Sequence, residues 1–236
     1  MRNLRELSRG AIRLLLNHDD FLNKSMKVLS IFGASGATGQ ILVAEALAQG
    51  YAVKAICRHK ASLTLQHEYL SVFEGEIDSS SCLNVIEGTD VVLCVLGQRR
   101  GDSTPFCAEV TRLVLQAMET TGVKRMLCMT GAMIGGRNAA YRSWFIRQMV
   151  KSFHKRMPEM AADRALQERY IAESRTDWTI IKPPRLTNGT ARGKYTLGET
   201  VRVSAFSAIS RADVADCLLK SIDNSSTFGK FLVMKN

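Results

Sequence analysis

The sequence predicts an α/β fold, a doubly wound and mostly parallel sheet with helices on both faces. Short apolar runs rich in branched side chains alternate with longer segments in which apolar residues recur at helical spacing. One run, residues 90–96, is almost entirely apolar, which is typical of a strand covered on both faces. The chain has 236 residues, 46% of them hydrophobic, so we expect a single domain with a sizeable core. This domain is expected to span residues 26–236 and to include a small C-terminal lobe for a substrate.

The expected strands are apolar runs too short for helices, bounded by glycine, proline or charged residues. They cover residues 28–32, 52–57, 70–73, 90–96, 124–130 and 178–182, the last being ended by two prolines. Short strands are also expected near 194–197, at 201–203 and at 230–234.

Helices are expected where apolar residues follow a period of 3.6. The first runs from the glycine-rich turn after residue 32 to Gly50, and the second covers 80–87 with Ser79 or Ser80 as its cap. The others cover 105–121, 158–174 and 210–222. Between residues 131 and 158 lies a polar, arginine-rich insertion, to which no helix is assigned before Pro158.

Residues 1–25 are expected to lie outside the domain as an N-terminal extension. Their apolar core is far shorter than the ~20 residues that span a bilayer, and no small-residue cleavage site follows it. Three alternatives remain: a short amphipathic helix, a disordered arm, or a segment that is not translated because the protein starts at Met26. We favour the last two and assign no chemistry to the extension.

The turn between the first strand and the first helix carries three glycines. In this setting the first glycine permits a tight turn, the second lets the backbone approach a diphosphate, and the third lets helix pack on strand. Free N–H groups at the helix start would face the anion. The turn therefore predicts a Rossmann-type dinucleotide site; the alternative is an ordinary strand–helix turn. The residues assigned to the site are Gly33, Ser35, Gly36, Ala37, Thr38 and Gly39.

The residue after the second strand selects the cofactor. An acidic residue there would bind the ribose hydroxyl of NAD, whereas this chain has Arg58, with Lys60 nearby. A guanidinium can hold a 2′-phosphate through paired, charge-assisted hydrogen bonds. We therefore expect NADP(H) in preference to NAD(H); the alternative is a solvated basic turn.

Other candidate residues follow the later strands, because ligands of such sheets lie across the carboxyl ends of the strands. Ile77 and Asp78 are expected at the adenine. A second glycine-bearing turn, Gly97-Gln98-Arg99, is expected near the diphosphate and ribose, with a plain surface loop as the alternative.

Two loops are expected to flank the nicotinamide, with the substrate pocket between them. They are Thr130-Gly131-Ala132 after the fifth strand and Pro183-Pro184-Arg185 after the sixth. The 131–158 insertion would cover this pocket. Its Met133, Trp144 or Phe145 would form an apolar wall, or serve only as packing residues.

Composition narrows the classes of partner. The net charge is +10, and removing residues 1–25, with five basic and three acidic residues, leaves 27 − 19 = +8. This suits an anionic cofactor, and since no basic run is interleaved with aromatics we expect neither nucleic acid nor membrane as a partner. Six cysteines without a C-x-x-C pair and only four histidines predict buried thiols, no metal site and a cytoplasmic location. The expected partner is a small-molecule substrate, and the expected state a monomer or homodimer.

Several of these motifs occur in one order and together resemble the atypical short-chain dehydrogenase/reductase superfamily. They are the glycine turn, Arg58, Asp78, the Gly97 loop, Thr130-Gly-Ala, the Glu173-Ser174 helix end, Lys182-Pro-Pro-Arg185 and Ser210-Arg-Ala-Asp-Val-Ala215. The chain is most similar to NAD(P)H-binding proteins of the biliverdin-IXβ reductase/flavin reductase type. The resemblance runs from Met26 almost to the end and implies a Rossmann fold that binds NAD(P)H.

The chain departs from this resemblance at the catalytic positions. Members that reduce carbonyls use a Tyr-x-x-x-Lys pair, but none of the five tyrosines here is followed by lysine four residues later. The corresponding positions hold Met160 and Arg164. Where flavin-reductase relatives have a serine and a histidine, this chain has Gly131 and Arg185, which counts against a tetrapyrrole substrate.

These observations predict an NADPH-dependent reductase that passes hydride to a conjugated acceptor such as a flavin or quinone. Flavin reduction needs no protein proton donor, so positioning and electrostatics suffice. Thr130 would orient the nicotinamide or the substrate, and Arg185 would hold an anionic group of the substrate. Two alternatives are a non-catalytic NADP(H)-binding redox sensor and a sugar-nucleotide epimerase.

Overall fold

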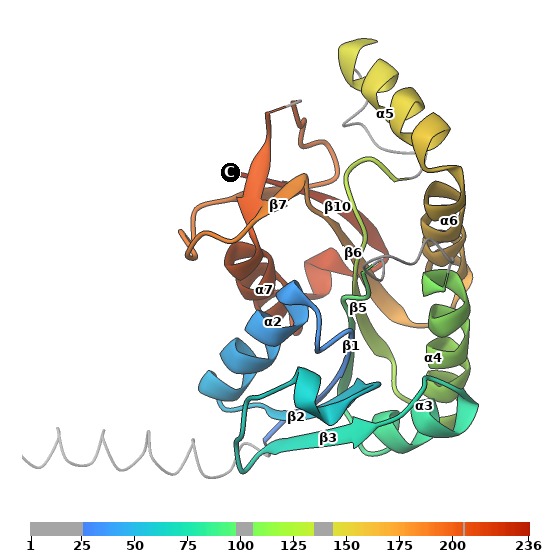
Figure 1. The fold of residues 1–236 in the computed structure, drawn as a ribbon, viewed down its shortest axis with the longest axis vertical. Helices are drawn as coiled ribbons and strands as arrows, with labels where there is room; N and C mark the ends of the chain where they lie inside the picture. Colours follow the sequence, from blue (N-terminus) through green and yellow to red (C-terminus); the bar gives the residue numbers. More distant parts are fainter. Residues whose placement is uncertain (1–25, 98–105, 135–143, 205) are drawn as a thin grey trace, which may run out of the picture.

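The central element is an eight-stranded sheet. The computed structural model describes residues 26–97, 106–134, 144–204 and 206–236 (Figure 1). In spatial order the strands are β3 (Leu70–Glu74), β2 (Ala52–Cys57), β1 (Val28–Phe32), β4 (Val91–Cys94), β5 (Arg125–Met129), β6 (Asp177–Lys182), β10 (Lys230–Lys235) and β8 (Thr196–Gly198). Every pairing is parallel except that of β8 with β10. The doubly wound, mostly parallel fold expected from the sequence is confirmed.

The strand order reverses at β1. This strand pairs with β2 on one side and with β4 on the other. The chain passes from β1 to β2 and from β4 to β5, so the connections after these two neighbouring strands run in opposite directions. A crevice opens at such a switch point because the two following connections cover opposite faces of the sheet. The glycine-rich turn that follows β1 lies at this crevice.

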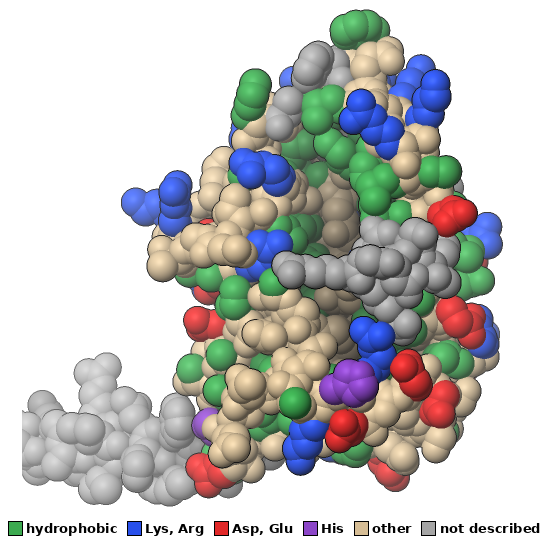
Figure 2. All heavy atoms as spheres, in the orientation of Figure 1, with side chains coloured by type: hydrophobic (Ala, Val, Ile, Leu, Met, Phe, Trp, Pro, Cys, Tyr) green, Lys and Arg blue, Asp and Glu red, His purple; other side chains and the backbone are tan. Residues whose placement is uncertain are grey.

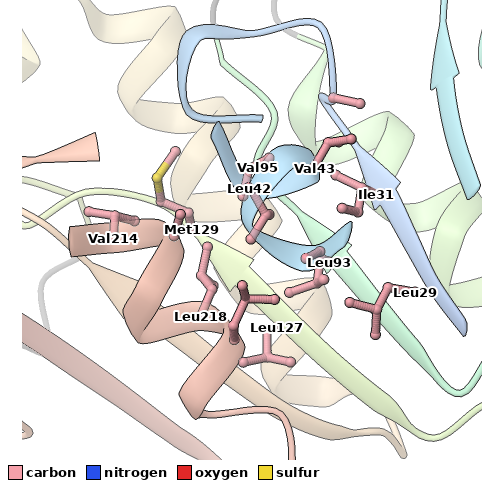
Figure 3. Packing of buried hydrophobic residues seen from close by; sticks show 14 of the residues in the cluster. Leu29, Ile31, Leu42, Val43, Leu93, Val95, Leu127, Met129, Val214 and Leu218 are labelled. Atoms are coloured by element: carbon pink, nitrogen blue, oxygen red, sulfur yellow. The ribbon is translucent and has the colours of Figure 1, made fainter. Parts of the chain in front are cut away.

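Helices cover both faces of the sheet. In Figure 1, α2 (Ala37–Ala48) and α7 (Arg211–Lys220) lie on one face, and α3 (Ser79–Ile86), α4 (Cys107–Thr121) and α6 (Pro158–Glu173) lie on the other. Strand alternation divides the core in the same way: Leu29 and Ile31 of β1 join the first layer, and Phe32 joins the second. Figure 3 shows the first layer, where Leu42 of α2 and Leu218 of α7 pack with the sheet residues.

The parts around the carboxyl edge differ from the sequence expectation. Helix α5 (Trp144–Arg156) lies within the insertion to which no helix was assigned. Two short strands that were not expected, β7 (Arg185–Thr187) and β9 (Ala208–Ser210), form a separate parallel pair. The expected strand at 201–203 is wrong, because these residues have no regular structure, whereas the one near 194–197 is observed as β8.

The start of α3 is another correction. Asp78, and not Ser79 or Ser80, is the N-cap, and its Oδ1 accepts a hydrogen bond of 2.7 Å from the amide of Ser81. The Ser81 hydroxyl accepts one of 2.8 Å from the Asp78 amide, which completes a capping box.

Among the described residues, two 3₁₀ turns, η1 (Lys60–Ser62) and η3 (Ser225–Thr227), complete the elements. Within the described ranges, no helix combines the length and the apolar character that crossing a bilayer requires.

Candidate functional site

The turn after β1 is built around two close backbone approaches. Gly33 has φ of +89°, and a Cβ there would lie 2.8 Å from the carbonyl carbon of Val95. A Cβ on Gly39 would lie 2.0 Å from the carbonyl oxygen of Gly33. Both positions therefore exclude any side chain, and the first turn of α2 packs directly on the end of β1.

Gly36, between them, has a different role. It is the N-cap of α2, with an ordinary φ of −73°, and a Cβ there would meet only the Gly33 carbonyl oxygen, at 3.2 Å. No side chain caps this helix, and its first turn contains no acidic residue. Since the first amides of a helix have no intrahelical acceptor, the start of α2 offers N–H groups and a partial positive charge to an anion.

A cleft of about 770 Å³ opens at this helix start. This volume lies within the usual range of ligand sites, ~300–1,000 Å³. Eight of the predicted cofactor residues line the cleft: Gly33, Ser35, Gly36, Ala37, Thr38, Arg58, Ile77 and Gly97. The sequence reasoning missed several others, among them Gln40, Glu76, Phe106 and Arg211.

Arg58 is exposed on the wall of this cleft, directly after β2. Gln40 positions the loop that follows, since its Nε2 donates to the carbonyl oxygens of Ser35 at 3.0 Å and of Ser62 at 3.2 Å. The glycine turn and the loop bearing Arg58 are thus joined by one side chain of α2.

Asp78 lies beside the cleft but is not part of its lining. Its hydrogen bonds from Ser81 hold the pKa of the Asp78 carboxyl below its ordinary value, so the group is ionised and committed to the cap of α3. Two further predicted residues, Gln98 and Arg99, lie outside the described residues.

A second cavity, of about 470 Å³, lies after β5 and β6. Its wall contains all six residues of the two predicted nicotinamide loops: Thr130, Gly131, Ala132, Pro183, Pro184 and Arg185. Met133 also lines it, together with Ile146, Met149 and Phe153 of α5. Trp144 does not line this cavity and is 66% exposed, and the side chain of Phe145 lies outside the described residues. Figure 2 shows the molecule hollowed between the β7 side and the α5 side.

A buried ion pair lies behind Thr130. Lys182, 1% exposed, pairs with Glu168, 6% exposed, and donates a hydrogen bond of 2.7 Å to the carbonyl oxygen of Ile134. The Thr130 hydroxyl donates to the same Glu168 oxygen at 2.6 Å. Burial lowers the pKa of the Lys182 ammonium, and the Glu168 carboxylate opposes this shift. The pair joins α6 to the end of β6 and fixes the direction of the Thr130 hydroxyl.

Helix α6 presents two further residues to the second cavity. Met160 and Arg164, which stand at the positions of the absent Tyr-x-x-x-Lys pair, both line it. The Arg164 guanidinium donates to the carbonyl oxygen of Leu96 at 2.6 Å and to Oε1 of Gln167 at 2.8 Å. Arg164 therefore links this cavity to the end of β4, where Leu96 lines the first cleft.

A family comparison identifies the fold's cofactor. Residues 33–225 match the model of a family described as NAD(P)H-binding. The chain belongs to the NAD(P)H-binding family. The match covers the glycine turn, both cavities and α7, so the two sites described above lie within the family's domain.

Solved structures with the same fold include several oxidoreductases. A short-chain dehydrogenase/reductase from Veillonella parvula in complex with NADP has a TM-score of 0.73 at 17% identity, covering 89% of this chain and 94% of that one. The anaerobillin reductase ChuY from Escherichia coli O157:H7 has a TM-score of 0.72 at 22% identity, with coverage of 88% and 96%. A putative NAD-dependent epimerase/dehydratase from Bacillus halodurans has a TM-score of 0.71 at 18% identity, with coverage of 89% and 94%. This chain is thus an NAD(P)H-binding protein with an oxidoreductase-like fold.

The sequence reasoning did not identify Glu168 as part of the site. The available signal was its position on α6, since Met160, Arg164 and Glu168 recur at intervals of four and so share one helix face. The other signal was Lys182, a charged residue at the end of the apolar run Trp178–Ile181, which requires a partner if the strand is buried.

Replacing Glu168 with leucine should strongly destabilise the protein. The change leaves the Lys182 ammonium buried with the carbonyl of Ile134 as its remaining hydrogen-bond partner and the Phe231 ring 5.6 Å away, and should cost about 3–5 kcal/mol of unfolding free energy. The double variant Glu168→Leu/Lys182→Met removes both charges and should be closer to wild type. Urea unfolding gives the unfolding free energies of both variants. Equal stability of the single and double variants would contradict the assigned role of the ion pair.

The control is Glu109→Leu, which breaks the exposed pair with Arg112 and should cost less than about 1 kcal/mol of unfolding free energy.

Substitutions at Gly39 and Gly36 should have different effects, the first mainly on stability and the second mainly on NADPH binding. Gly39→Ala places a Cβ against the Gly33 carbonyl and should lower the melting temperature markedly. Gly36→Val brings its Cβ to 3.2 Å from the Gly33 carbonyl oxygen, a far smaller overlap than the 2.0 Å at Gly39, so it should lower the melting temperature much less, while its side chain blocks the anion site and abolishes NADPH binding. Thermal unfolding and a fluorescence titration with NADPH distinguish the two. Unchanged NADPH affinity in Gly36→Val would show that the diphosphate does not bind at this turn.

Proposed function

We propose that the protein is an NADPH-dependent reductase that transfers hydride to a conjugated acceptor such as a flavin or quinone. The observation that supports this most is the adjacency of the two cavities. Met129 and Leu186 line the amide-rich cleft, and their chain neighbours Thr130 and Arg185 line the apolar cavity. A nicotinamide at this junction would lie against the acceptor pocket.

The first cleft fits an NADP(H) molecule. The amides at the start of α2 would hold the diphosphate, and Arg58, for which the structure gives no acidic partner within hydrogen-bonding distance among the described residues, would bind the 2′-phosphate. Ile77 and Asp78 would lie at the adenine, and the Gly97 turn near the diphosphate and ribose. The bound cofactor supplies the hydride, and the chain's own residues supply binding and orientation.

The second cavity suits a flat, apolar acceptor. Methionine, isoleucine, phenylalanine and proline account for half of its lining residues, and Arg185 at its edge would hold an anionic group of the substrate. The Thr130 hydroxyl, fixed by Glu168, would orient the nicotinamide amide or the acceptor through its free lone pairs. The 130–132 and 183–184 loops would hold the nicotinamide against the acceptor and exclude water from the junction.

One observation favours a second candidate, a redox sensor that binds NADP(H) without turnover. Met160 and Arg164 face the cavity where related reductases carry a proton-donating tyrosine and its lysine, and neither can donate a proton at neutral pH. A sugar-nucleotide epimerase is less well supported, since the apolar wall offers few partners for sugar hydroxyls. A cytoplasmic location and a monomeric or homodimeric state remain predictions.

Arg58→Ala tests the choice of cofactor. Loss of the paired charge-assisted bonds should weaken NADPH binding by about tenfold or more and leave NADH binding within about twofold of wild type. Lys60→Ala, which removes a cation that does not line the cleft, is the matched control and should change neither affinity strongly. Isothermal titration gives the dissociation constants of NADPH and NADH for both variants, to be compared with those of wild type. If the NADPH affinity of Arg58→Ala equals that of wild type, Arg58 does not bind the 2′-phosphate.

Turnover tests the reductase directly. The full chain is incubated with NADPH and with FMN, riboflavin or a naphthoquinone, and cofactor oxidation is followed by absorbance. We expect oxidation above background with at least one acceptor and none in Gly36→Val. Tight NADPH binding with no oxidation by any acceptor would instead support the sensor.

A further inference from the structure

We propose that the outward face of α5, with Phe206 across the cavity mouth, binds the surface of a membrane that contains anionic phospholipid. This surface is called the α5 face below, and consists of Trp144, Arg147, Lys151 and Lys155. The proposal concerns binding to a lipid surface and does not depend on the reductase activity. It departs from the expectation, drawn from the sequence, that no membrane is a partner.

The α5 face is a cationic stripe with an aromatic residue at one end. Its four residues recur at intervals of three and four, so they lie on one side of the helix, and all four are exposed. The opposite side of α5 faces the second cavity, because Ile146, Met149 and Phe153 line it. The helix thus has an apolar side directed into the protein and a basic side directed outward.

The charge of this helix is uncompensated locally. Residues 144–156 contain four Lys/Arg residues and no Asp or Glu, and the nearest acidic residue in the chain is Glu159 on α6. No ion pair found among the described residues involves α5. Figure 2 shows basic and hydrophobic side chains at the α5 end of the molecule, with acidic side chains from the level of α6 downward. Such a surface attracts anionic groups over about a Debye length.

Exposed apolar side chains gather at the same end. Six large hydrophobic residues of the described chain are exposed, and three of them, Trp144, Met157 and Phe206, lie on α5, directly after it, or on the facing loop. Phe206 is 92% exposed, next to Ser207 and close in sequence to Val203 and Ser204, which line the cavity opposite α5. Trp144 thus lies on the α5 face, on the side of the helix away from the cavity, and Phe206 lies on the loop that carries the opposite cavity wall.

This combination favours lipid over the other polyanions. Nucleic acid or an acidic protein would satisfy the cations, but neither accounts for the exposed apolar side chains of Met157 and Phe206 at the same end of the molecule. A bilayer interface accepts both features, since cations bind headgroups and Trp or Phe rings insert at the acyl boundary.

Vesicle sedimentation tests the proposal on the full chain. Wild type should partition onto phosphatidylcholine–phosphatidylglycerol vesicles, bind phosphatidylcholine vesicles much more weakly, and lose binding as ionic strength rises. Lys151→Glu/Lys155→Glu should weaken partition by at least about tenfold, since each surface cation contributes roughly fivefold. The matched control is Lys124→Glu/Arg175→Glu, which reverses the same charge at two exposed residues just before β5 and β6, at the other edge of the sheet. The control variant should bind the anionic vesicles about as strongly as wild type. Both double variants retain residues 1–25, so this segment contributes equally to each.

Tryptophan fluorescence gives a second, site-specific readout. The chain has two tryptophans, and Trp178 is only 8% exposed, so a blue shift on adding anionic vesicles would report Trp144. Trp144→Phe should remove the shift, and Phe206→Ser should reduce partition. Equal loss of binding in the two charge-reversal variants would overturn the proposal, as would an unshifted spectrum. Binding of a single-stranded oligonucleotide through the α5 face, without binding of vesicles, would overturn it in favour of nucleic acid.

Discussion

The contact between the first turn of α2 and the end of β1 determines where this protein can hold an anion. Only hydrogen fits between Gly39 and the Gly33 carbonyl, so the helix axis starts directly at the strand end and its free amides reach the crevice. Gly33 in turn lies against the backbone of Val95, so the turn is pressed onto β4 at the point where the strand order reverses. A longer or bulkier turn would move the amides away from this crevice, and the fold would keep its sheet while losing its binding site.

A second constraint acts at the other half of the crevice. Lys182 ends a strand that is covered on both faces, and a lone ammonium there would be costly. Glu168 neutralises it, and because Glu168 is on α6 the pair aligns this helix with β6. The same helix face then directs Met160 and Arg164 into the second cavity, so an interaction needed for stability also decides which side chains the acceptor would meet.

The sequence was sufficient for the parallel core and for the strand ends. Buried parallel strands are continuous apolar runs, and residues just past them must gather at one edge, so most predicted site residues line one of the two cavities. The sequence was insufficient for elements with a weak hydrophobic pattern and for residues whose contact partners are distant in the chain. The spacing of Ile146, Met149 and Phe153 suits a helix, but none was expected there, because the segment was interpreted only as a polar, arginine-rich insertion. The short strands β7 and β9 have no periodicity of their own and form because they pair with each other. Glu168 could not be identified as a site residue until α6 was placed against β6.

The chemistry of the second cavity limits which acceptors are plausible. A carbonyl that receives hydride must also receive a proton as its oxygen becomes an alcohol, and related reductases supply it from a tyrosine on the helix before the sixth strand. Here that helix presents a thioether and a guanidinium, and neither side chain serves as a general acid. Thr130 is no substitute, because its hydroxyl hydrogen is directed at Glu168 and away from the cavity. An extended conjugated acceptor avoids the difficulty, since it delocalises the added electron pair and can be protonated later by water. The same extended, apolar character would favour such an acceptor in the methionine-rich cavity. In the proposed reductase, the shape of the pocket and the missing proton donor would therefore favour the same class of substrate for independent reasons.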